Sequence, residues 1–118
     1  MDNKRIFEKL KTILNQFEVG LSVQNDKSDN YYLNTPITQS NKKAEFFGAV
    51  QIKKSYVAFH LMPVYYHPEM LDNTSQELKK RMQGKSCFNF KEMDDNLFAE
   101  LNTLTKTAFE KYKALNKV

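Results

Sequence analysis

The sequence predicts a small α+β domain, with an antiparallel sheet of about four to five strands covered on one face by an N-terminal and a long C-terminal helix. Three observations predict this fold. Apolar residues recur every three or four positions near both ends of the chain, which is typical of helices that bury one face. In the middle, short runs alternate between apolar and polar residues, which is typical of half-buried strands. Strands that follow one another with helices outside the run favour an α+β arrangement.

Both terminal helices carry start and stop signals. The first is expected to be capped by Asp2 or Asn3 and to end at Gly20. Its apolar stripe consists of Ile6, Phe7, Leu10, Ile13, Leu14 and Phe17. The last begins at Asp94 and Asp95, where the helix dipole favours carboxylates. Its apolar positions are Leu97, Leu101, Leu104, Ala108, Tyr112 and Leu115.

The strands differ in the strength of their signal. Two weak strands are expected at Leu21–Gln24 and Tyr31–Thr35, around a turn at Asn25–Asn30, and an exposed loop is expected at Thr38–Lys42. The clearest hairpin joins Glu45–Lys53 to Ser55–Met62. In its first strand, Phe46, Val50 and Ile52 are expected on one face. In its second, Val57, Phe59 and Leu61 are expected opposite Tyr56, Ala58, His60 and Met62.

The segment after the hairpin contains two prolines and two tyrosines. Pro63–Pro68 is expected to be a rigid connection, followed by a short helix at Pro68–Leu71. Thr74 and Glu77 match the capping-box pattern, which predicts a helix through Met82 that Gly84 ends. Ser86–Phe90 is expected to be a strand, with Cys87 buried as a small hydrophobe.

Length and composition limit the class of protein. The 118 residues predict one domain, 1–118. A single cysteine cannot form an internal disulfide, and no secretory signal or membrane-spanning run is visible, so we expect a cytoplasmic protein. The net charge of +4 has one dense basic stretch, consisting of Lys79, Lys80, Arg81, Lys85 and Lys91. Because nucleic-acid-binding proteins usually carry a more continuous basic surface, we do not expect a nucleic-acid partner.

Few residues indicate a chemical site. His60 and His67 are seven residues apart and lack the further ligands of a zinc site, so no metal or cofactor is expected. No pair of carboxylates is spaced for acid–base catalysis, so no catalytic residue is assigned. The cluster Tyr56, Tyr65 and Tyr66 is either a pocket wall or packing at the rim of the core.

Part of the chain resembles the YdhG-like family of small domains of unknown function. The resemblance covers about residues 46–112 and rests on Phe47-Gly48-Ala49-Val50, Tyr56-Val57-Ala58-Phe59-His60, Gly84-Lys85, Phe88-Asn89-Phe90, and Leu97 with Leu101. It implies a hairpin, a short helix, a strand and a final helix in this order. Some relatives have been proposed to be iron chaperones, which would need an acidic surface. The basic first helix, with Lys4, Arg5, Lys9 and Lys11, departs from that pattern, so the iron role is not carried over.

The sequence therefore predicts a non-enzymatic module that binds a ligand or another protein. The site is expected between the hairpin and the Pro63–Pro68 segment, and its residues are His60, Tyr65, Tyr66, Arg81 and Lys85. The expected ligand is a small anion or an acidic protein segment, and no membrane partner is expected. Three alternatives stay open: nucleic-acid binding through residues 79–91 with Phe88 and Tyr66 as stacking platforms, an enzyme that uses Cys87 or His60, and a homodimer.

Overall fold

The computed structural model describes residues 2–37 and 42–118, so residues 38–41 of the predicted Thr38–Lys42 loop lie outside the described residues. Its sheet has five antiparallel strands in the order β1-β2-β3-β4-β5, each paired with the next along the chain. The strands are β1 (Ser22–Lys27), β2 (Asn30–Asn34), β3 (Phe46–Ile52), β4 (Val57–Leu61) and β5 (Cys87–Phe90). The helices are α1 (Asn3–Asn15), α2 (Met62–Tyr66), α3 (Gln76–Lys79) and α4 (Asp95–Ala114), with single 3₁₀ turns at η1 (Glu18–Gly20) and η2 (Pro68–Leu71).

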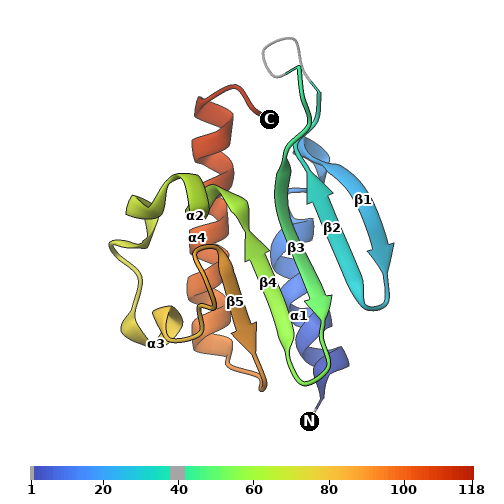
Figure 1. Cartoon of the computed structure of the whole chain (residues 1–118), viewed down its shortest axis with the longest axis vertical. Helices are drawn as coiled ribbons and strands as arrows, with labels where there is room; N and C mark the ends of the chain where they lie inside the picture. The colour runs from blue at the N-terminus through green and yellow to red at the C-terminus, as the bar shows by residue number, and fades with distance from the viewer. Residues whose placement is uncertain (1, 38–41) are drawn as a thin grey trace.

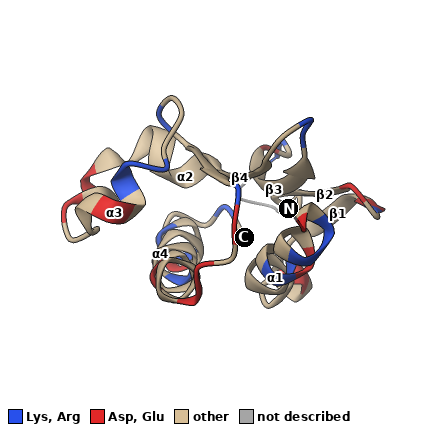
Figure 2. Cartoon of the chain, turned by 90° about the horizontal axis from the view of Figure 1, so that it is seen from below, with Lys and Arg blue, Asp and Glu red and all other residues tan. Residues whose placement is uncertain are grey.

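The two long helices lie on the same side of the sheet (Figures 1 and 2), which confirms the predicted α+β fold. Asp2 caps α1 by accepting a hydrogen bond from the Arg5 backbone N–H (3.1 Å), and Asp94 caps α4 through the Leu97 N–H (3.1 Å). The predicted end of α1 at Gly20 is wrong, because the helix stops at Asn15 and a 3₁₀ turn follows. No helix in the described part of the chain is both long enough and apolar enough to cross a membrane.

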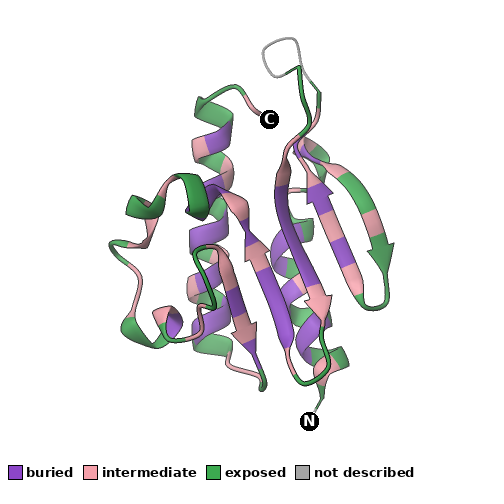
Figure 3. Ribbon diagram, in the orientation of Figure 1, coloured by how far each residue is buried: buried purple, intermediate pink, exposed green. Residues whose placement is uncertain are grey.

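The sheet has a face covered by helices and an opposite face, which we call the outer face. Directly opposed residues of antiparallel strands share a face, so the register assigns each position. The helix-covered face carries Tyr31, Leu33, Gly48, Val50, Ile52, Val57, Phe59, Leu61, Phe88 and Phe90. The outer face carries Asn30, Tyr32, Ala49, Gln51, Ala58, His60, Cys87 and Asn89. In β2 and β5, buried residues consequently alternate with partly exposed ones (Figure 3).

The predicted face of Phe46 is wrong, because β3 has a bulge at its start. Phe46 was expected beside Val50, but the register between β2 and β3 shifts there, and Phe47 is the residue without a partner. The ring of Phe46 instead stacks on Tyr32 of the outer face, with centroids 4.6 Å apart. Phe47 packs edge-on against Phe109 of α4 (6.1 Å), so the bulge supplies the core with an extra aromatic side chain.

The helix predicted through Met82 is much shorter in the structure. Ser75, not Thr74, caps α3, which ends at Lys79. The carboxylate of Glu100, on α4, accepts hydrogen bonds from the backbone N–H and the hydroxyl of Ser75, both at 2.6 Å. The predicted rigid segment Pro63–Pro68 contains α2, with Pro63 in its first turn, where a missing N–H costs nothing.

After α3 the chain returns along the outer edge of β5. The Asn89 N–H donates to the Arg81 carbonyl (2.8 Å), and the Gln83 N–H donates to the Cys87 carbonyl (2.9 Å). Met82 pairs with Phe88 between these two bonds. Gly84 turns the chain back with a φ of +82°. Two further predictions are wrong: Leu115 is 44% exposed, and Cys87 is half-buried on the outer face rather than inside the core.

Candidate functional site

Ring and cation contacts join three of the five residues predicted to form a site. Tyr65 and Tyr66 lie on the exposed side of α2, with their ring centroids 5.2 Å apart and their exposed fractions at 49% and 61%. The Lys85 ammonium lies 5.9 Å from the centre of the Tyr65 ring, so these three residues form one surface cluster. The other two predicted residues are His60, on β4, and Arg81, beside the edge of β5.

His60 lies on the outer face, half-buried, with its ring 6.3 Å from that of Phe46. Burial lowers its pKa below the usual value for histidine, and the positive charge of Lys53 lowers it further. The imidazole is therefore neutral at pH 7, and it can stack or form hydrogen bonds without adding charge to the outer face.

Arg81 lies in a cavity of about 400 Å³ at the edge of the sheet. The cavity is lined by Ser55, Tyr56, Lys80, Arg81, Met82, Gln83, Asn89 and Lys91, and we call it the basic cavity. Three of these residues are cationic, and none of the described lining residues is acidic. Tyr56 belongs to the tyrosine cluster predicted as a pocket wall, but the structure separates it from Tyr65 and Tyr66, which do not line this cavity.

The register of the sheet edge builds the basic cavity. Because Met82 pairs with Phe88, whose side chain faces the helices, the neighbouring Arg81 and Gln83 face the outer side together with Asn89. The same alternation puts Tyr56 and Lys91 on the outer side, since they flank the pair Val57–Phe90. Lys91 and Arg81, ten positions apart in the sequence, thus line one cavity.

Cys87 and His60, the candidates for an enzyme, are direct cross-strand partners on the outer face. No hydrogen bond joins their side chains in the described part of the chain, because the thiol donates instead to Oδ1 of Asn89, at 3.3 Å. Burial raises the pKa of Cys87 above its usual value, which disfavours the nucleophilic thiolate. Among the described residues, no three His, Cys, Asp or Glu side chains gather as a ligand set for a metal.

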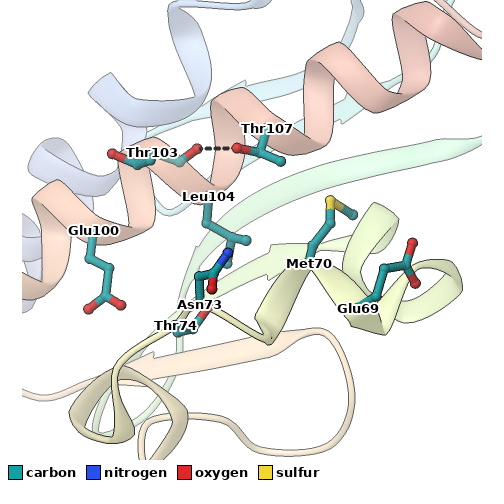
Figure 4. A pocket seen from close by; sticks show the side chains of 8 residues that line it. All are labelled: Glu69, Met70, Asn73, Thr74, Glu100, Thr103, Leu104 and Thr107. Carbon is teal, nitrogen blue, oxygen red and sulfur yellow. Dashed lines mark hydrogen bonds between the residues drawn. The ribbon is translucent and has the colours of Figure 1, made fainter.

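A second cavity, of about 360 Å³, lies between η2, the segment that follows it and α4 (Figure 4). Its lining residues are Glu69, Met70, Asn73, Thr74, Glu100, Thr103, Leu104 and Thr107. Glu100 holds Ser75 at the start of α3, and the Thr107 hydroxyl donates to the Thr103 carbonyl (3.1 Å). These polar groups already bind parts of the chain itself, so we assign this cavity to the connection between the helices.

Comparison with protein-family models, with curated proteins and with solved structures found no match in any of the three. The fold and site define a five-stranded antiparallel domain with two long helices on one face and a cationic cavity at the edge of the other. Function is therefore inferred from this chain's own residues.

The cations of the basic cavity can be identified in the sequence, but their grouping around one cavity cannot. Lys80, Arg81 and Lys91 belong to the basic stretch noted above, and Tyr56 to the tyrosine cluster. Ser55, Gln83 and Asn89 were not predicted. The antiparallel pairing of β4 with β5 is the signal that could have found these three residues. Its Val57–Phe90 pair brings the start of β4 beside the end of β5.

Proposed function

We propose that this chain is a non-enzymatic binding module, and that the basic cavity holds an anionic group of its ligand. The observation that carries the proposal is the gathering of Lys80, Arg81 and Lys91 around one cavity without an acidic lining residue among those described. Protein surfaces usually intersperse charges of both signs, and like charges held close together repel each other. An anion in the cavity would neutralise these three cations.

The other lining groups suit an oxyanion. Arg81 can bind two oxygens of a phosphate or carboxylate through its planar guanidinium, whereas a lysine ammonium acts as a point charge. The hydroxyls of Ser55 and Tyr56 and the amide of Asn89 can donate further hydrogen bonds. The volume of about 400 Å³ lies within the range of small-ligand sites.

Binding is favoured over catalysis by the position of the reactive side chains. Neither His60 nor Cys87 lines the basic cavity, and the raised pKa of the Cys87 thiol disfavours a thiolate. A cytoplasmic location is part of the proposal, since Cys87 is a free thiol and the fold needs no oxidising compartment.

Titration with tripolyphosphate, followed by amide chemical shifts, tests the proposal. We expect shifts at Ser55, Gln83 and Asn89, and a loss of affinity of about tenfold or more in Arg81→Gln and in Lys91→Gln. Lys106→Gln, which removes an exposed cation from α4, is the matched control and should bind as the native protein does.

The proposal fails if neither tripolyphosphate nor an acidic peptide shifts any of these amides, or if Lys106→Gln weakens binding as much as Arg81→Gln. An acidic peptide titrated in parallel separates the two expected ligand classes. Saturation of the same amides by the peptide alone, with no response to tripolyphosphate, would identify an acidic protein segment as the ligand.

A further inference from the structure

The basic cavity is continuous with the outer face of the sheet. Asn89, which lines the cavity, lies directly opposite Ala58 on the outer face, and Ala58 lies opposite Gln51. Tyr56 directly precedes β4, the strand of His60, and the alternation of side chains places both residues on the same side. A ligand longer than one anionic group could therefore extend from the cavity across β4, β3 and β2.

The charge of the outer face suits a polyanion. Strands β2, β3, β4 and β5 contain no carboxylate, and in β1 Asp26 is bound to Lys11 of α1, at 2.6 Å. Figure 2 shows the acidic residues on helices and turns rather than on the central strands. Lys53 adds a fourth cation: its backbone N–H donates to the carbonyl of Tyr56 (2.8 Å), and its charge acts on both His60 and Cys87.

The neutral groups of the outer face distinguish between polyanions. Aromatic rings stack on nucleobases with little sequence preference, and side-chain amides can bind base edges. The outer face presents the rings of Tyr32, Phe46, Tyr56 and His60 and the amides of Asn30, Gln51 and Asn89. An acidic peptide would use the cations but would leave this combination of rings and amides without a role.

Tyr56 is the best-placed ring for stacking. It lines the basic cavity beside the cations, it is partly exposed, and no other ring or cation packs against it within the described residues. Tyr32 and Phe46, by contrast, stack on each other. A base on Tyr56 would leave its phosphate near Lys91 and Arg81.

We propose that the ligand is single-stranded nucleic acid, with a backbone phosphate in the basic cavity and bases on the outer face, starting at Tyr56. This inference rests on the proposed function, because it uses the same cavity for the phosphate. From the sequence alone we did not expect a nucleic-acid partner, because the positive charges are spread along the chain. Folding brings Lys53, from the turn after β3, to the same corner of the sheet as Lys80, Arg81 and Lys91. A single strand is favoured over a duplex because its base faces are free to stack.

Fluorescence anisotropy with a labelled oligothymidylate of about eight nucleotides tests the inference. Four cations predict that the logarithm of the association constant falls with the logarithm of salt concentration, with a slope of about −2 to −3. Lys91→Gln should weaken binding and reduce that slope by about 0.7. Tyr56→Leu should weaken binding about tenfold and leave the slope unchanged, because stacking releases no counterions.

Tyr66→Leu is the matched control for Tyr56→Leu. It removes an exposed tyrosine of α2 that lies outside the basic cavity, and it should leave the affinity unchanged. Thermal melts of each variant establish that it is folded before its affinity is compared.

The possible failures are distinguishable. If tripolyphosphate binds the basic cavity but oligothymidylate binds no more tightly, the inference is overturned and the proposed function stands. Equal binding of a duplex, or an unchanged affinity of Tyr56→Leu, also overturns it, because only phosphates would then be recognised. If tripolyphosphate, the acidic peptide and oligothymidylate all fail to bind, both proposals fall.

Discussion

Gly84 lies in the turn that joins the Arg81–Gln83 segment to β5, and its φ of +82° is in the left-handed region. A Cβ added there would meet no atom within 4 Å, so Gly84→Ala creates no clash. Its cost is therefore only that of the backbone conformation, about 1–2 kcal/mol for an L-residue. The lower entropy of the unfolded alanine chain offsets about 0.4–1 kcal/mol of this, which leaves a net loss of about 1 kcal/mol.

Urea denaturation monitored by circular dichroism measures this loss, which corresponds to a fall in melting temperature of about 4 °C. Gly84→Asn is the matched control, because asparagine adopts the left-handed region more readily than alanine does. It should cost less than Gly84→Ala although its side chain is larger. The reasoning is refuted if Gly84→Ala leaves the free energy of unfolding unchanged, or if asparagine costs as much as alanine.

Three further predictions concern Tyr112, Gly48 and His60. The Tyr112 hydroxyl is buried and has no hydrogen-bond partner among the described residues, and burial raises its pKa to about 12. Tyr112→Phe should therefore keep or raise stability, by up to about 1 kcal/mol in a urea melt. Gly48→Ala should cost about 1–3 kcal/mol in the same assay, since the new Cβ would lie 2.9 Å from the His60 carbonyl oxygen and 3.2 Å from Leu14; an unchanged midpoint would contradict this. The pKa of His60 is lowered in the folded protein. Below about pH 6.5 this imidazole therefore binds a proton more readily in the unfolded chain than in the folded one. As the pH falls through that range, the native protein should lose stability relative to His60→Gln, and parallel melts against pH would show the two curves diverging.

Local patterns predicted the elements whose signals repeat. The apolar spacing of α4 identified the buried side of this helix, and Asp94 identified its start. In β4, Val57, Phe59 and Leu61 share one face, as predicted. Where a long-range contact decides, the local pattern was wrong. Thr74 was predicted to cap α3, but Ser75 is the cap, because Glu100 of α4 binds the backbone N–H and hydroxyl of Ser75.

The candidate site could be predicted only in its residue types. Arg81 and Lys85 are four positions apart and were expected to act together. The turn at Gly84 lies between them, and it leaves Lys85 against Tyr65 while Arg81 lines the basic cavity. Which cation meets which aromatic ring depends on the pairing of residues 81–83 with β5, and no periodicity in the sequence encodes that pairing.

The two edges of the sheet differ in how they would meet another copy of the chain. Open strand edges are templates for intermolecular pairing and aggregation. The edge of β5 already pairs with Arg81–Gln83, so its hydrogen-bonding groups there are occupied. The other edge, β1, has a register shift between Val23 and Asn25 and ends in Asp26 and Lys27. Irregular, charged edges of this kind oppose the addition of a strand. This small domain can therefore keep one face of its sheet free of helices without pairing edge to edge with the sheet of another copy.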